Sequence, residues 1–372
     1  MTATDAVSDD PAPHPSIPSR VDDISIDWLN DVLGDEFGTI VGLDVAHFGE
    51  GVGILGELAR LSLTYAPGES GPASIVAKCA TPSVENQFLS VAMGFYVREV
   101  NFYLQVADGV DIRVPTPFHA ATSETGVPFV LLIEDIVGAR TPNQLAGLSV
   151  DEARRIISSV VPLHTQFWGT DEVLALDWLP PMNNDMYKGA QAMAVDYFPA
   201  FAHHFGDRVP DDMLETIRIA CGRYTELLDY TVSVGTPTFT HTDCRAENYL
   251  FGGPDGDDAT TLVDFQLSTR HVGMWDITNL LAGSMVPELR RAHERQLIGE
   301  YVEQVQGAGI DFTLEQAMKE YRIGLLQQTT AQVITSDLQG GNDRGAQLLE
   351  QLHLRPILAA IDNDVGDVLD DF

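Results

Sequence analysis

Alternation of apolar and polar residues predicts a small sheet in the first third of the chain. Residues 57–65 place an apolar side chain at every second position, which is the period of a half-buried strand. Four other short apolar segments bounded by turn residues are also expected to be strands: 39–48, 74–80, 117–122 and 128–134. Residues 84–106 carry an apolar stripe at helical spacing, and they predict one helix between the third and fourth strands.

Helical spacing dominates the rest of the chain. Ser149 is followed at the third position by Glu152, and Thr313 by Gln316, so both pairs predict capping boxes at helix starts. The first of these helices is expected to end near Trp168. Further helices are expected at 186–205, 211–230, 287–306, 313–335 and 343–361.

One strand-rich segment, 237–265, interrupts this helical part with short apolar runs, a polar loop and a Gly/Asp turn. Together these patterns predict an α+β fold of two lobes. We expect an acidic, Pro-rich, disordered tail over 1–20, a small β-rich N-lobe over 21–135 and a larger helical C-lobe over 136–372.

The charge balance argues against several classes of partner. The chain has 55 acidic residues against 21 basic ones, a formal net charge of -34. Nucleic acids require a clustered basic face and anionic membranes attract basic segments, so we expect neither as a partner. No apolar run reaches the roughly 18 residues of a membrane span. The three cysteines lack metal-ligand or disulfide spacing, which favours a reducing, cytoplasmic location.

Gly51, Gly53 and Gly56 match the pattern G-x-G-x-x-G. A dinucleotide-binding interpretation requires a helix directly after the glycines, whereas the residues that follow here alternate as a strand. A strand–glycine loop–strand hairpin fits better, because its backbone N–H groups can approach phosphates without an intervening side chain. An ordinary glycine hairpin remains an equal alternative at this point.

Lys78 is one of only three lysines in the chain, and it lies within an apolar strand. A buried ammonium is costly unless it is paired, and the obvious partner is Glu99 on the following helix. Such a Lys–Glu pair between strand and helix can hold the lysine toward nucleotide phosphates. The alternative is an edge-strand lysine whose ammonium extends to water.

The sharpest pattern is H-x-D-x4-N, formed by His241, Asp243 and Asn248, with Asp264 following at the end of an apolar run. One Asp that accepts a hydroxyl proton, with an Asn and a second Asp that hold Mg²⁺, is what phosphoryl transfer to an acceptor requires. Hard oxygen ligands without Cys or multiple-His spacing argue against zinc. Asp and Asn in loops are commonly turn formers, but their order behind the glycines and Lys78 makes coincidence a poor explanation.

These segments together resemble the aminoglycoside/choline-kinase superfamily of protein-kinase-like phosphotransferases, in particular its ecdysteroid-kinase-like (CHK-kinase-like) branch. The resemblance extends from about Val41 to about Met285. It implies a protein-kinase-like two-lobe fold with ATP and Mg²⁺ as cofactors. The strings that carry it are RLSLTY, SIVAKCA, REVNFY, VLLIEDI, LHTQFW, HTDCRAENYLF, LVDFQLS and WDITNLL.

For the cofactor, the resemblance implies that Lys78 contacts the ATP phosphates and that Glu99 positions it. The backbone from Glu134 to Ile136 is the implied interlobe hinge that meets adenine. The glycine hairpin is the implied cover of the phosphates.

For catalysis, the resemblance implies that Asp243 is the base and that Asn248 and Asp264 bind Mg²⁺. Two departures from the protein-kinase pattern occur: the loop reads His-Thr-Asp, and D-F-Q replaces D-F-G, a feature usual in the ecdysteroid-kinase-like branch. Arg245 stands two residues after the base, where many protein kinases have a lysine, so we treat it as a hypothetical phosphate contact. An exposed loop arginine is an equal alternative. Asp276 is expected to brace the catalytic loop.

These observations predict an ATP- and Mg²⁺-dependent phosphotransferase that acts on a hydroxyl or amine of a small molecule. The acceptor itself stays open among aminoglycosides, choline-like amines, sterol-type alcohols, macrolides and sugars, because its pocket is expected in the weakly patterned segment 143–236. Two other classes also stay open. One is a nucleotide-binding pseudokinase or scaffold, and the other is a metal-dependent phosphohydrolase that uses His241, Asp243 and Asp264.

Overall fold

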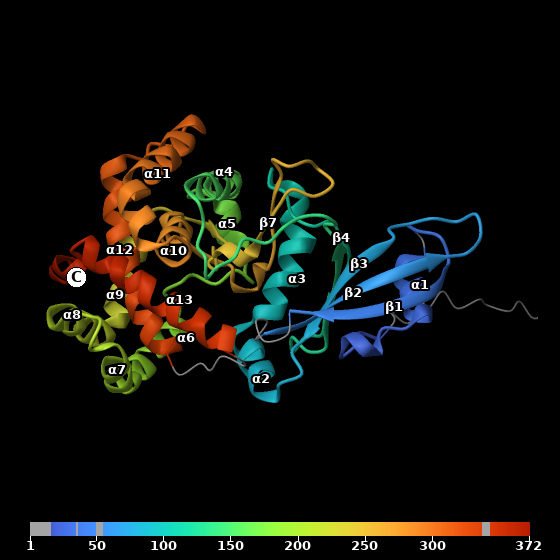
Figure 1. Ribbon diagram of the computed structural model, residues 1–372, viewed down its shortest axis with the longest axis horizontal. Coiled ribbons are helices and arrows are strands. Elements are labelled where there is room, and N and C mark those ends of the chain that lie inside the picture. Colours follow the sequence, from blue (N-terminus) through green and yellow to red (C-terminus); the bar gives the residue numbers. More distant parts are fainter. Residues whose placement is uncertain (1–15, 35, 50–54, 337–342) are drawn as a thin grey trace, which may run out of the picture.

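The five predicted strands form one antiparallel sheet in the order β1-β2-β3-β5-β4 (Figure 1). The computed structural model describes residues 16–34, 36–49, 55–336 and 343–372. Each strand is confirmed to within one residue; the bounds are β1 (Ile40–Phe48), β2 (Gly56–Tyr65), β3 (Ser74–Ala80), β4 (Pro117–Thr122) and β5 (Phe129–Glu134). Phe48 pairs with Leu58, so β1 and β2 form the expected hairpin. Gly51 and Gly53 lie outside the described residues.

The single helix expected over 84–106 is wrong, because the chain forms α2 (Val84–Met93) and α3 (Phe95–Gln105) there. Gly94, between them, has φ of 72°, a left-handed conformation that ends a helix and that glycine adopts without strain. The apolar stripe continues across this position, which is why periodicity alone could not reveal the break.

The helical lobe contains the predicted helices, two of them divided. Both capping boxes are confirmed, at Ser149 and Thr313. The segment 186–205 forms two helices, as does 211–230, and the short helix α1 (Ile26–Leu33) was not predicted. The bounds are α4 (Val150–Phe167), α5 (Asp171–Ala175), α6 (Asp185–Gly189), α7 (Gln191–Phe205), α8 (Asp211–Gly222), α9 (Tyr224–Val234), α10 (Met274–Ser284), α11 (Pro287–Gly307), α12 (Leu314–Thr335) and α13 (Asp343–Asp362).

Two short antiparallel strand pairs hold the strand-rich segment together. β6 (Pro237–Thr240) pairs with β9 (Thr269–Val272), and β7 (Tyr249–Phe251) pairs with β8 (Thr260–Leu262). The pattern did not predict β9. The loop from 241 to 248 leaves β6 and enters β7, and Asp264 follows β8, so the two strand pairs bring both parts of the predicted chemistry to one place.

β5 explains how the two lobes share the sheet. Phe129 and Leu131 belong to the large core of the helical lobe, whereas Val130 and Leu132 belong to a smaller core with α1. All four are fully buried because both faces of the sheet are covered. The helix α3 crosses between the sheet and the helical lobe (Figure 1). The predicted α+β two-lobe fold is confirmed, and α3 can therefore join a strand residue to the segment 237–265.

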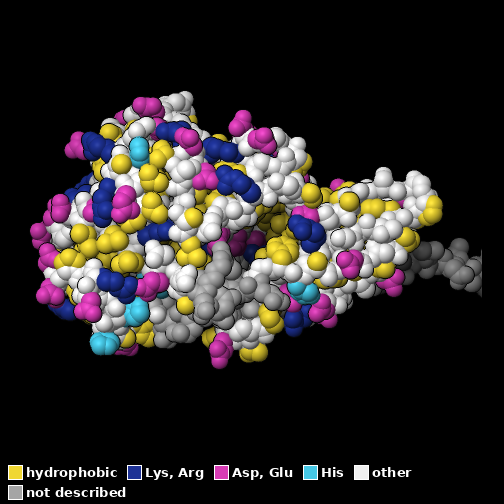
Figure 2. Space-filling model, in the orientation of Figure 1, with side chains coloured by type: hydrophobic (Ala, Val, Ile, Leu, Met, Phe, Trp, Pro, Cys, Tyr) yellow, Lys and Arg dark blue, Asp and Glu magenta, His cyan; other side chains and the backbone are white. Residues whose placement is uncertain are grey.

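The acidic surplus is spread over the face of the molecule that Figure 2 shows. On the face shown in Figure 2, Asp and Glu side chains are scattered over the molecule and do not gather in one patch. Among the described helices, none has the length and apolar character needed to cross a bilayer.

Candidate active site

Lys78 of β3 joins two carboxylates from distant parts of the chain. Its Nζ lies 2.7 Å from Glu99 Oε2 on α3 and 2.9 Å from Asp264 Oδ1. Only 8% of the lysine side chain is exposed. Gly56 on the neighbouring strand leaves room for it, because a Cβ at this position would lie 3.0 Å from Lys78 Cε. The predicted Lys78–Glu99 pair is present. The alternative, an edge-strand lysine whose ammonium extends to water, is wrong, because β3 lies between β2 and β5.

The electrostatics of this triad depend on its burial. Burial alone would lower the pKa of Lys78, but Asp264 and Glu99 raise it above its ordinary value. Burial raises the pKa of Glu99 despite the nearby ammonium. For Asp264, burial would raise the pKa, yet Lys78 and Arg245 hold it below its usual range. The lysine is therefore charged and Asp264 is ionised at neutral pH.

Asp264 is held by its backbone and by the residue that follows it. Its φ of 70° and ψ of 64° are left-handed, and they precede the short 3-10 helix η4 (Phe265–Leu267). Phe265 stacks on Phe102 of α3 with ring centroids 3.5 Å apart, and it also contacts His241 at 4.7 Å. The side chain of Phe265 thus connects α3 to the loop 241–248.

The polar loop brings the predicted base and the predicted metal ligand into direct contact. Asn248 Nδ2 donates to Asp243 Oδ2 and to the Asp243 carbonyl, both at 2.8 Å. Arg245 Nε donates to the same Asp243 Oδ2 at 3.1 Å, and its Nη1 donates to Glu247 at 3.2 Å. About a fifth of the Arg245 side chain is exposed, so Arg245 is not a freely exposed loop arginine.

A buried carboxylate fixes the start of this loop. Asp276 of α10 accepts from the backbone N–H groups of His241 and Thr242, each at 2.7 Å. His164 of α4 lies 3.1 Å from the same carboxylate and 3.0 Å from Tyr301 Oη. Asp276 is fully buried, and its predicted bracing role is confirmed.

Sequence patterns did not reveal a second support of the loop. The Ala246 N–H donates to Gln144 Oε1 at 2.9 Å and to Ser284 Oγ at 3.0 Å. Gln144 is fully buried in the segment between the lobes. No spacing in the sequence marks it, because its role arises only when distant segments pack together.

The two predicted hinge residues lie where β5 enters the helical lobe. Glu134 ends the strand, and its carboxylate accepts two hydrogen bonds of 2.9 Å from Arg113 Nη2. Between them, Asp135 accepts from Arg60 at 2.6 Å and from Ser74 at 2.7 Å. Ile136 is buried. Side-chain contacts thus fix the backbone from Glu134 to Ile136. Contact of this backbone with adenine stays a prediction.

The oxygen atoms near the triad fit a small hard cation. Asp264 is ionised, and Asn248 contacts Asp243 through its Nδ2, so its Oδ1 takes no part in that contact. Within the described residues, no group of three or more His, Cys, Asp or Glu side chains forms a metal cage. A pair of oxygen ligands suits Mg²⁺, which commonly keeps waters and takes its other ligands from substrate phosphates.

Comparison with known proteins agrees with this geometry. A model of the ecdysteroid kinase-like family matches residues 175–308. No curated protein matches the sequence. The predicted resemblance is confirmed over this matched segment, which includes the whole H-x-D-x4-N loop and Asp264.

Solved structures with this fold come from several organisms. Choline kinase from Cryptosporidium parvum aligns with a TM-score of 0.57 and 11% identity over 93% of this chain and 96% of its own. An ethanolamine kinase from Plasmodium vivax gives 0.52 and 10% over 88% and 86%. The GDP complex of a mutant aminoglycoside 2'-phosphotransferase gives 0.53 and 12% over 88% and 95%. At these identities the likeness establishes the fold: this chain has the protein-kinase-like fold of small-molecule kinases.

Proposed function

We propose that the protein is a small-molecule kinase that transfers the γ-phosphate of ATP to a hydroxyl or amine group. The single observation that carries this proposal is the joint placement of Lys78, Glu99 and Asp264. Phosphoryl transfer from a nucleotide requires a positioned cation, which a strand lysine held by a helix glutamate provides. The phosphohydrolase alternative leaves this lysine–glutamate pair unexplained. The family match and the fold support the same class.

On the nucleotide side, Lys78 would neutralise charge on the phosphates while Glu99 fixes its direction. The β1–β2 hairpin, with Gly51, Gly53 and Gly56, would cover the phosphates. The backbone of the hinge at Glu134 and Ile136 would meet the base. We assign ATP as the nucleotide, with GTP as the alternative that the assay must include.

On the acceptor side, Asp243 would orient the attacking group and accept its proton. Its carboxylate is held by Asn248 and Arg245, so its direction is set before substrate binds. Arg245 would also contact the transferred phosphate. Asn248 and Asp264 would hold Mg²⁺, which when bound supplies charge neutralisation for the phosphates. The acceptor would be a small molecule. The structural relatives include a choline kinase, an ethanolamine kinase and a phosphotransferase in complex with kanamycin.

A coupled assay for nucleoside diphosphate release, run with ATP and GTP against an acceptor library, tests the proposal. Thermal shifts with and without nucleotide and Mg²⁺ can first select acceptors, because a ligand that binds the native state raises its apparent stability. Acceptor-dependent turnover that Asp243→Ala and Asp264→Ala abolish is the expected result.

Two other results would overturn this function. Nucleotide binding without turnover with any acceptor would indicate a pseudokinase or scaffold. Phosphate release from simple phosphoesters in the absence of nucleotide would indicate a phosphohydrolase.

A further inference from the structure

A buried arginine lies beside the glutamate of the triad and makes a separate set of contacts. Arg98 is 2% exposed. Its Nη1 donates to Tyr187 Oη at 3.0 Å. The same nitrogen donates to the carbonyls of Ser268 at 3.2 Å and Leu267 at 3.4 Å, and Nη2 donates to the Met93 carbonyl. One guanidinium therefore joins α2, α3, α6 and the segment just after η4.

All these partners are uncharged oxygens, which is unusual for a buried cation in a chain of net charge -34. A buried charge is costly to desolvate, and removing its partners is more costly still. Successive residues of a helix point about 100° apart. Arg98 is thereby directed away from Glu99, and it leaves that carboxylate to Lys78.

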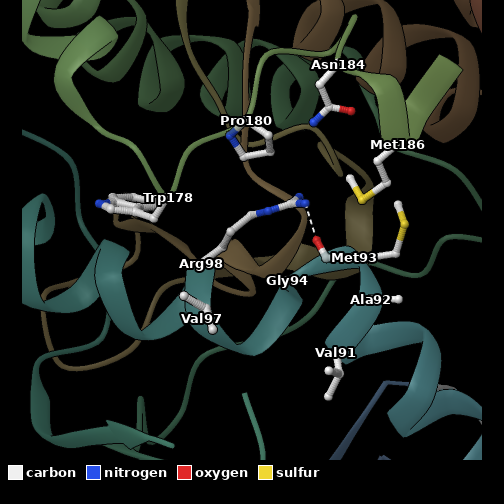
Figure 3. A pocket seen from close by; sticks show the side chains of 10 residues that line it. All are labelled: Val91, Ala92, Met93, Gly94, Val97, Arg98, Trp178, Pro180, Asn184 and Met186. Carbon is white, nitrogen blue, oxygen red and sulfur yellow. Dashed lines mark hydrogen bonds between the residues drawn. The ribbon is translucent and has the colours of Figure 1, made fainter. Parts of the chain in front are cut away.

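The same guanidinium lies at a cavity between the lobes (Figure 3). The cavity has a volume of about 280 Å³ and is lined by the end of α2, the start of α3 and the segment 178–186. Its walls are largely apolar, with Val91, Val97, Trp178 and Met186 around the arginine. Small solutes in water can therefore approach the position of this side chain.

We propose that Arg98 is a positioning residue that fixes α3, and hence Glu99, relative to the segment carrying Asp264. Leu267 and Ser268 follow Asp264 by three and four residues, so their bonds to Arg98 set the distance between the two carboxylates that Lys78 bridges. Tyr187 extends the same contact to α6, in the segment 143–236 where the acceptor pocket is expected. A change in α6 would then reach Glu99 through one side chain.

This inference rests on the proposed function, because positioning matters only if the triad acts on a nucleotide. The first measurement does not depend on activity. Amide hydrogen exchange over residues 95–105 should rise at least tenfold in Arg98→Lys and Arg98→Ala relative to wild type. Arg322→Ala is the control at a distant site: Arg322 also donates to main-chain carbonyls, those of Asn363 and Asp364, and it pairs with Asp367 near the C-terminal end of the chain.

The second measurement is kinetic. Arg98→Ala should lower kcat at least tenfold while the Kd for a non-hydrolysable ATP analogue changes less than threefold, because Lys78 and the hairpin remain. Ethylguanidinium at millimolar concentration should restore part of kcat through the cavity, and ethylammonium at the same concentration should not. Tyr187→Phe, which removes a single hydrogen bond, should lower kcat two- to tenfold.

The outcomes separate the two proposals. If wild type shows no turnover with any acceptor, the kinase function fails and the exchange data alone decide the role of Arg98. If wild type is active, either of two results would overturn the positioning role. One is unchanged amide exchange over residues 95–105 in Arg98→Lys, and the other is an unchanged kcat in both Arg98→Lys and Tyr187→Phe. Should Arg98→Ala not fold, Arg98→Lys and Tyr187→Phe carry the same test.

Discussion

Lys78 Nζ lies 2.9 Å from Asp264 Oδ1, although 186 positions of sequence separate the two residues. The ammonium comes from the sheet lobe, and the carboxylate follows a hairpin of the helical lobe. Because Glu99 contacts the same nitrogen, one cation stands between two carboxyl groups, of which Glu99 is buried and Asp264 is about a quarter exposed. This arrangement joins the two lobes at the point where phosphates are proposed to bind, so we expect it to affect both stability and turnover.

Replacing Lys78 by Met should destabilise the protein strongly. The change leaves the buried Glu99 and the partly exposed Asp264 without their cation, and breaking a buried ion pair commonly costs about 3–5 kcal/mol. Glu99→Gln in the Lys78→Met background should recover part of this loss, because it removes one of the two anions. The free energy of unfolding in urea, measured for the single and double variants, checks the coupling.

Lys188 supplies the control for this cycle. It pairs with Asp229 at 2.7 Å, but half of the Asp229 side chain is exposed. Lys188→Met should therefore cost less than about 1 kcal/mol. An equal cost for the two lysines would contradict the view that burial determines the strength of the triad.

Asp243→Asn should remove catalysis and preserve structure. General base catalysis typically contributes about 10²–10⁴-fold to a rate, and kcat should fall by a factor in that range. The substituted amide can still accept the hydrogen bond from Asn248, so the melting temperature should stay near that of wild type. Parallel measurement of kcat and of the thermal shift caused by an ATP analogue distinguishes the two effects. A variant that keeps wild-type kcat would exclude Asp243 as the base.

The sequence predicted the strands of the sheet because alternation and turn residues are local signals, and every strand of the large sheet lies within one residue of its expected range. The break at Gly94 escaped detection because the apolar stripe continues through it. The pair of Lys78 and Glu99 could be predicted from the cost of a buried ammonium. Contacts that depend on tertiary packing, such as those of Gln144 and Arg98, have no signature in the spacing of residues and became visible only in the fold.

Asp276→Ala should disturb the loop 241–248, although Asp276 itself is not proposed to touch a substrate. The change deprives two buried backbone N–H groups, of His241 and Thr242, of their acceptor. Leaving buried donors unsatisfied costs about 1–3 kcal/mol each, so the free energy of unfolding should fall by about 2–6 kcal/mol. Well below the melting temperature, kcat should still fall at least tenfold because Asp243 loses its orientation. Normal kcat in a folded, destabilised variant would show that Asp276 is needed for folding alone.

Glu320 of α12 should make the protein less stable as the pH rises. The residue is 5% exposed, and burial raises the pKa of its carboxyl group from 4.5 to about 8. Between these two values the unfolded chain has released the proton while the folded protein still holds it. The unfolded state then binds fewer protons than the native state, so the free energy of unfolding decreases with pH by at most about 1.4 kcal/mol per unit from this group. The effect is absent below pH 4.5 and is complete above about pH 8.

Glu320→Gln should remove this contribution, because the amide carries no proton to release. Urea unfolding of wild type and variant at intervals from pH 5 to 8.5 checks the prediction: the difference in stability should grow with pH in favour of the variant. Glu315→Gln, on the exposed face of the same helix, should leave the slope as in wild type. A constant difference between Glu320→Gln and wild type across this range would contradict the prediction. Glu320 would then ionise in the folded protein as readily as in the unfolded chain, and burial would not raise the pKa of its carboxyl group.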